Sequence, residues 1–379
     1  MAVRTDLALV LGGGGAHAAY QVGVLAAIVE RVPDLEFPIL TGVSAGAINT
    51  AYLAAHRGSF AAAVQALRGE WGRLTVERVY RIRPARLTLA GLRWLGAMVL
   101  GRHGGTAALH GLVDMEPLRR FLAHHLDFGG IDANIAAGRL RAVALSATSY
   151  ASGQTVTFVH GVEGVPMWRR ALRYSVTARL TLDHVMASAA VPILFPAVRV
   201  GDEFYGDGSV RQTAPLAPAI HLGARALLLI TTMRPGAAPA APLRRPPPPE
   251  YPSVAEVMTL LLHAVFLDAP EADAERLERI NQLLTACPAG AAESGGVHPV
   301  RLLVLRPSRD IGALAAAQGS RLPRPVRWMV GGLGGHRPGA ADFLSYLLFE
   351  PPYTRALIEL GYADAQTEWS RIERFLTGT

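Results

Sequence analysis

The segment FPILTGVSAGAINTAYLAAH at residues 37–56 decides how this chain folds. It opens with a short aliphatic run at 37–41, continues through the turn sequence G-V-S-A-G and ends in an alanine-rich helix pattern. The segment LALVLGGGGAHAAYQVGVLAAIV at residues 7–29 repeats this order, with four glycines between strand and helix. Two consecutive strand–turn–helix units predict parallel strands joined by crossover helices, and therefore an α/β fold.

The rest of the chain divides by composition. Further buried strands are expected at 140–146, 226–231 and 300–305. An α/β domain is predicted over residues 1–235, followed by a Pro-rich, extended linker over 236–252. Residues 253–379 are expected to form a mainly helical extension that packs on this domain and ends in a helix at 364–376.

Composition excludes several classes of protein. Half of the 379 residues are apolar and 18% are charged, which favours a large folded core over disorder. No apolar run is long enough for a membrane-spanning helix, and the single cysteine, Cys287, excludes an internal disulfide framework. Without a signal peptide pattern, a cytoplasmic location is expected. The net charge of +7 comes with no nucleic-acid motif, so no nucleic-acid partner is expected.

Gly42-Val43-Ser44-Ala45-Gly46 matches the nucleophile elbow G-x-S-x-G. In such an elbow a serine occupies a strained turn between a strand and a helix, and glycines two positions away allow the sharp bend. The hydroxyl is then presented at the end of the sheet, beside the positive end of the helix dipole. Gly42 and Gly46 are therefore predicted to shape the turn, and Ser44 is a candidate nucleophile.

The glycines Gly13, Gly14 and Gly15 follow the first strand and can turn several backbone N–H groups into one concavity. Such a concavity suits a phosphate or a developing oxyanion. The spacing also fits the dinucleotide fingerprint G-x-G-x-x-G/A. That alternative requires an acid at the end of the second strand, where this chain has the elbow, so we expect an oxyanion loop and no cofactor.

Two residues are candidates for the base that activates Ser44. His221 follows Asp207, which is the order Ser–acid–His of an α/β-hydrolase triad. Those enzymes place several strands before the nucleophile, however, and here only one precedes Ser44. His221 also ends a short helix pattern, where capping or solvent contact is expected. Asp207 lies in a Gly-Asp-Gly turn that exposes its carboxylate to a cleft.

The joint order of these motifs resembles the patatin-like phospholipase family. The resemblance rests on the glycine-rich loop, the elbow, ASAAVPILFP at 187–196, Asp207-Gly208 and QTAPL at 212–216, and covers roughly residues 7–231. It implies a three-layer α/β/α sandwich with a mainly parallel central sheet and hydrolysis of acyl esters in phospholipids or other acyl lipids. It further implies Ser44 as nucleophile, Asp207 as base and Gly13, Gly14 and Gly15 as oxyanion hole, with no metal. A non-catalytic lipid-binding or scaffold protein on the same fold is the alternative.

The chain departs from the family pattern near the glycine-rich loop. His17-Ala18 stands where the family usually has Arg-Gly, and Ser209 stands where it has Gly or Ala. A mostly neutral histidine would remove a positive charge near a lipid phosphate, which favours neutral acyl esters as substrates. The Cβ of Ala18 is expected to disturb the loop if this position needs a glycine-only conformation.

The segment 82–101 combines arginines with leucines and Trp94. A basic amphipathic segment is a candidate for peripheral membrane contact or for a lid over an apolar pocket. An ordinary core-packed helix with its arginines in solvent is the alternative interpretation.

Overall fold

The computed structural model describes residues 6–82, 111–232, 257, 260, 261, 263, 264, 268–286, 298–316 and 345–378. The predicted linker at 236–252 and all of the amphipathic segment after Ile82 lie outside these ranges. The domain boundaries at 235 and 252 therefore stay predictions. None of the described helices is both long and apolar enough to cross a membrane.

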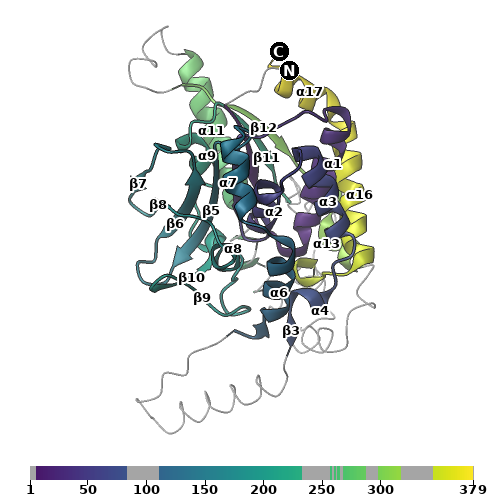
Figure 1. Ribbon diagram of the computed structural model, residues 1–379. Coiled ribbons are helices and arrows are strands. Elements are labelled where there is room, and N and C mark those ends of the chain that lie inside the picture. Colours follow the sequence, from purple (N-terminus) through teal and green to yellow (C-terminus); the bar gives the residue numbers. More distant parts are fainter. Residues whose placement is uncertain are drawn as a thin grey trace, which may run out of the picture.

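One mixed sheet runs through the described part of the chain, in the order β12-β11-β1-β2-β5-β6-β8-β7 (Figure 1). Its core strands β12, β11, β1, β2 and β5 are all parallel. The bounds are β1 Leu7–Leu11, β2 Ile39–Val43, β5 Ala142–Ser149, β6 Thr155–Gly161, β7 Arg169–Arg170, β8 Arg173–Thr177, β11 Ala226–Ile230 and β12 Arg301–Leu305. The predicted strands at 7–11, 37–41, 140–146, 226–231 and 300–305 thus correspond to β1, β2, β5, β11 and β12, within a few residues.

Helices cover both faces of the sheet and give three layers (Figure 1). Side chains alternate along β1: Leu9 joins the core on one face and Val10 the core on the other. The first face is covered by α1 Ala18–Arg31, α2 Ala45–Ala55, α3 Phe60–Trp71, α6 Glu116–His125, α8 Leu182–Ser188 and α16 Pro351–Thr367. The second is covered by α9 Ala217–His221 and α11 Asp268–Ala286. The expected α/β/α sandwich is confirmed.

The C-terminal part of the chain is built into this architecture. Strand β12 pairs in parallel with β11 and extends the sheet. Helix α16 packs along α1 (Figure 1), where the Tyr20 hydroxyl donates to Asp364 Oδ2 at 3.1 Å. The helix predicted at 364–376 is broken at Glu368, which separates α16 from α17 Trp369–Thr377. The remaining short elements are α4 Val76–Val79, α7 Gly129–Ala136, α13 Ile311–Ala316, η1 Gly15–His17, η2 Gly208–Val210 and the two-stranded pair β3 Arg81–Ile82 and β4 Val113–Asp114.

A short antiparallel strand pairs with β5 beyond the point where β2 ends. This strand, β10 Glu203–Asp207, pairs with β5 through residues 205–207 and with β9 Val198–Val200 through residues 203–205. Val43, the last residue of β2, lies opposite Ser146, and Asp207, the last residue of β10, lies opposite Ala147. Strands β2 and β10 therefore run toward each other along the same edge of β5, and their carboxyl ends meet.

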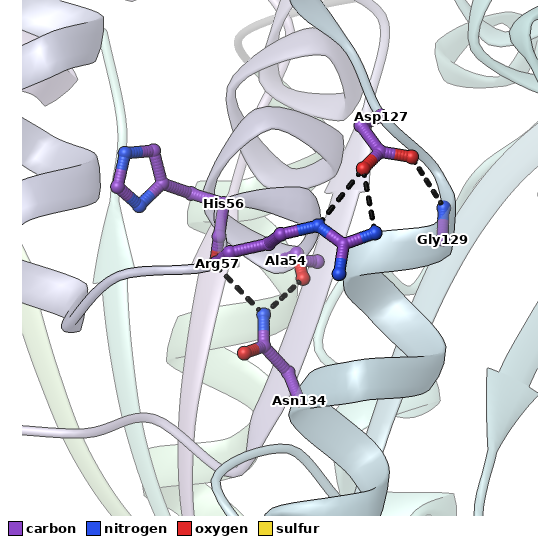
Figure 2. Close-up of polar contacts among 6 residues, drawn as sticks. All are labelled: Ala54, His56, Arg57, Asp127, Gly129 and Asn134. Carbon is purple, nitrogen blue, oxygen red and sulfur yellow. Dashed lines mark hydrogen bonds and ion pairs between the residues drawn. The ribbon is translucent and has the colours of Figure 1, made fainter.

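Side-chain contacts fix the far end of α2, the helix that begins directly after Ser44. The amide of Asn134, on α7, donates to the carbonyl oxygens of Ala54 and His56 at 2.8 and 2.9 Å (Figure 2). These carbonyls belong to the last turn of α2, where carbonyl groups have no hydrogen-bond donor within the helix. Nearby, the Arg57 guanidinium donates to Asp127 in an exposed ion pair (Figure 2).

Replacing Asn134 by alanine is expected to lower the free energy of unfolding by about 1–3 kcal/mol, because the buried Ala54 carbonyl and the partly buried His56 carbonyl lose their donor. Urea denaturation measures this loss. Asp127→Ala is the control at a neighbouring site: its contacts with Arg57 and with the Gly129 amide are both exposed, so its loss should stay within about 1 kcal/mol. An equal loss in both variants would show that Asn134 is not what holds the end of α2.

Candidate active site

Ser44 occupies a strained turn between β2 and α2. Its backbone has φ 56° and ψ −131°, a conformation that residues other than glycine rarely adopt. A Cβ on Gly42 would lie 2.3 Å from Thr50 Oγ1, and one on Gly46 would lie 2.3 Å from the Leu11 carbonyl oxygen. Both flanking glycines are therefore needed for steric reasons, as the elbow pattern predicts.

A serine from another helix holds the backbone of the elbow. The Ser44 amide donates to Ser188 Oγ at 3.1 Å, and Ser188 Oγ donates to the Ser146 carbonyl oxygen at 2.7 Å. Ser188 ends α8 and is fully buried. It links the strained turn to β5, the strand that also carries β10. The Ser44 side chain itself is almost fully buried.

Asp207 lies next to the elbow, because the ends of β10 and β2 meet on β5. The residue is fully buried, and its backbone is fixed by the Ala190 carbonyl, which accepts from the Asp207 amide at 2.8 Å. Carboxylate Oδ1 accepts from the Ser209 amide at 2.9 Å. Among the described residues, Oδ2 meets no donor at regular hydrogen-bond geometry. One oxygen is thus anchored and the other is left without a strong partner.

Burial raises the pKa of Asp207 to about 7, because a carboxylate without water loses its solvation. Hydrogen bonding from the Ser44 hydroxyl, and next from Ser209, opposes this rise in pKa. A carboxyl group with a pKa near neutrality is suited to accept a proton at physiological pH.

The glycine-rich loop lies directly against the elbow. A Cβ on Gly46 would lie within 2.4 Å of both the Leu11 and the Gly12 carbonyl oxygens, so the two turns are in backbone contact. Gly14 and Gly15 have φ values of 141° and 57°, which accounts for glycine at both positions. Among the described residues, no acceptor binds the amides of Gly13 or Gly14. Gly15 and Ser44 line the same pocket.

A buried polar network fixes this loop relative to α1 and α2. Gln21 Nε2 donates to the Gly12 carbonyl at 2.9 Å, and Asn49 Nδ2 donates to Gln21 Oε1 at 3.0 Å. Asn49 Oδ1 in turn accepts from Trp71 Nε1 at 2.7 Å. Because Gln21 and Asn49 are fully buried, breaking one link would leave the others unsatisfied. The network holds the loop, the elbow helix and α3 in one arrangement.

Ala18 and His17, which depart from the family pattern after the loop, differ in their effect on the site. Ala18 has right-handed helical dihedrals, φ −62° and ψ −13°, so its Cβ adds no strain and the expected disturbance is absent. His17 is buried and its Nε2 lies 2.8 Å from Ser345 Oγ. Burial, and then the nearby His263, lower the pKa of His17 to about 3, so the side chain is neutral. The Ser209 amide donates to Asp207 Oδ1, as any residue other than proline could at this position.

His221 is not brought to Ser44. It ends α9 on the opposite face of the sheet, where its ring stacks on Trp168 at a centroid distance of 4.8 Å. Burial, and then Arg170 and Arg173, lower its pKa. His221 therefore packs against Trp168, where capping or solvent contact was expected from its position at a helix end. In the described part of the chain no group of three His, Cys, Asp or Glu side chains could hold a metal ion.

A deep apolar pocket opens beside Ser44. Its walls surround about 760 Å³ of space, the open solvent at its mouth included. Its walls come from α2, α3, α6 and the segment after α8, and one residue comes from far along the sequence. Representative lining side chains are Ile48, Leu67, Trp71, Leu118, Leu122 and Phe349. An ester carbonyl at Ser44 would thus have an apolar chamber next to it.

Several of these features have no local signal in the sequence. Ser188 lies inside the quoted motif at 187–196, but its hydrogen bond to Ser44 joins residues 144 positions apart. The apolar spacing of α3 and α6 predicts buried helices and not the pocket between them. Phe349 reaches the pocket only because α16 docks on α1.

Comparison with solved structures finds distant similarities. The crystal structure of VipD from Legionella pneumophila is similar with a TM-score of 0.36 and 11% identity, over 96% of this chain and 66% of the VipD chain. The type III effector protein ExoU is similar with a TM-score of 0.28 and 15% identity, over 90% of this chain and 73% of the ExoU chain. At TM-scores this low, neither similarity bears on activity. A search of curated protein sequences finds no match.

Comparison with protein families is decisive. The sequence model of the family described as "Patatin-like phospholipase" matches residues 9–220. The matched region is more than half of the 379 residues and includes the glycine-rich loop, the elbow and Asp207. Family membership supports a lipid acyl hydrolase, that is, an esterase or lipase activity. The chain belongs to the patatin-like phospholipase family.

Proposed function

We propose that this protein cleaves carboxylic esters of acyl lipids with Ser44 as nucleophile and Asp207 as the base that activates it. The observation that carries the proposal is the meeting of β2 and β10 on β5, which places the two residues together at the end of the sheet. No histidine among the described residues lines the Ser44 end of the pocket: His125, its single lining histidine, lies on α6.

The first step follows from the two carboxylate oxygens. Asp207 Oδ1 is held by the Ser209 amide, while Oδ2 has room for a proton. As Ser44 Oγ attacks the ester carbonyl carbon, its proton passes to Asp207. As the bond between the carbonyl carbon and the alcohol oxygen breaks, Asp207 gives this proton to the leaving alcohol and is ionised again, and the acyl group remains on Ser44 Oγ. Water activated by the same aspartate hydrolyses this acyl-enzyme and regenerates the serine.

The charge that develops on the carbonyl oxygen needs donors that are already in place. The amides of Gly13, Gly14 and Gly15 are our proposed oxyanion hole. Its support is the backbone contact between the loop and Gly46, together with the absence of described acceptors for Gly13 and Gly14. The Ser44 amide is not proposed as a donor, because it is bonded to Ser188.

The nucleophile is tested by labelling with a fluorophosphonate probe, which reacts with activated serines. Wild-type protein should be labelled, and Ser44→Ala should not. Labelling of Ser44→Ala would overturn the site assignment, while no labelling of folded wild type would favour a non-catalytic lipid-binding role.

The base is tested by ester turnover in two variants. Asp207→Asn should lower kcat by a factor of at least about 10², since the proton acceptor is lost. His221→Ala is the matched control and should keep most of the activity. The reverse pattern would restore a histidine triad.

The pH dependence of kcat/KM should follow Asp207. The base acts only when ionised, so activity should fall as the pH drops through about 7, the raised pKa of this carboxyl group. A base at His221 would give a midpoint below 6.5, because the pKa of that histidine is lowered. Initial rates on a soluble ester between pH 5 and 9, on the order of ten points, separate the two cases.

Headgroup preference depends on charge near the site. His17 is neutral and buried against Ser345, so it supplies no cation to a lipid phosphate. We therefore expect a neutral diacylglyceride to be hydrolysed at least as fast as a phospholipid with the same acyl chains. Parallel assays in mixed micelles measure the ratio, and a strong preference for the phospholipid would contradict this expectation.

A further inference from the structure

The apolar pocket follows one side of helix α2. Ser44, Ile48 and Tyr52 are spaced by four residues, so they lie on the same face of the helix and all line the pocket. Eight residues separate Ser44 from Tyr52, which corresponds to about 12 Å along the helix axis at 1.5 Å per residue. The pocket therefore extends two helical turns away from the nucleophile.

Polar groups gather at the end of the pocket that lies away from Ser44. Glu70 Oε2, from α3, lies 3.4 Å from His125 Nε2, from α6, and both residues line the pocket. Arg57, just after α2, donates to Asp127 at 2.8 Å, and Asp127 is two residues past His125, so the C-terminal ends of α2 and α6 lie side by side. Burial, and then the charge of Glu70, raise the pKa of Tyr52. Tyr52, Glu70 and His125 thus form a polar end wall on an otherwise apolar pocket.

Contacts outside the pocket hold this wall in place. Glu70 Oε1 accepts from Arg73 at 3.3 Å, and His125 Nδ1 lies 2.7 Å from the Phe121 carbonyl oxygen. The side chains of Glu70 and His125 remain 20% and 27% exposed, so water reaches them. An apolar chain pressed against them would displace that water from a charged group, which is unfavourable.

We propose that the Glu70–His125 pair ends the acyl-chain pocket near Tyr52, two turns of α2 away from Ser44, and thereby selects esters of medium-chain acids over long-chain ones. This inference rests on the proposed function, since it takes Ser44 as the site of attack. Methylene groups gain binding energy only while they are buried against apolar walls. Beyond the polar wall, additional carbons gain nothing or encounter the Glu70 carboxylate.

The experiment measures kcat/KM for p-nitrophenyl acetate, butanoate, octanoate, dodecanoate and hexadecanoate below their micelle concentrations. For wild type, kcat/KM should rise from acetate to octanoate and then stop rising or fall. In the double variant Glu70→Leu with His125→Leu, the ratio of hexadecanoate to octanoate should rise about tenfold, the factor expected for two more buried methylene groups. Glu116→Leu, an exposed ion-pair residue on the same helix as His125, is the control and should leave the profile unchanged.

A second variant shortens the pocket and decides the matter if the double variant does not fold. Ile48→Trp fills the space one turn from Ser44, so the ratio of octanoate to acetate should fall. A profile that is unchanged in both folded variants, or a wild-type profile that rises through hexadecanoate, overturns the inference while ester hydrolysis itself stands. If no ester is hydrolysed and Ser44 is not labelled by fluorophosphonate, the proposed function fails instead.

Discussion

The strained backbone at Ser44 is the constraint on which the rest of the structure depends. A serine with φ 56° and ψ −131° is less stable than in a regular conformation by about 1–3 kcal/mol, and the surroundings must hold it there. The protein does so with two glycines, with Ser188 bonded to the Ser44 amide and with Asn134 at the other end of α2. These contacts come from three separate parts of the chain, so the elbow is a product of the whole fold.

The same packing sets the chemistry of Asp207. Strand β10 meets β2 end to end on β5, and the Asp207 carboxylate there is completely buried. This burial raises the pKa of Asp207 toward neutrality. In water an aspartate would be a weak base, and a fully paired one would be weaker still. Here one oxygen is anchored by Ser209 and the other is not regularly bonded. The fold therefore buries a carboxyl group next to the serine that needs a base, although burial disfavours its ionised form.

The sequence predicts those parts of this fold that have local patterns. Aliphatic runs locate β1, β2, β5, β11 and β12, and the elbow motif locates the strained turn. The antiparallel pairing of β10 with β5 is a long-range contact with no local pattern, although Asp207 itself is singled out by its turn and by the family resemblance. Whether position 18 needs a glycine-only conformation could not be read from the sequence, because the dihedral angles at a loop–helix junction depend on where the helix begins; Ala18 has helical dihedrals. The pocket needs α3, α6 and Phe349 together, which only tertiary packing brings about.

The most direct test of the account is to locate the acyl group during turnover. Protein mixed briefly with p-nitrophenyl octanoate, quenched in acid and digested, should yield one peptide heavier by an octanoyl group, with the modification on Ser44. The same peptide from Asp207→Asn should stay unmodified on that timescale. An octanoyl group on a different residue, or turnover of the ester with no acylated Ser44 at any quench time, would contradict a mechanism in which Ser44 attacks and Asp207 takes its proton.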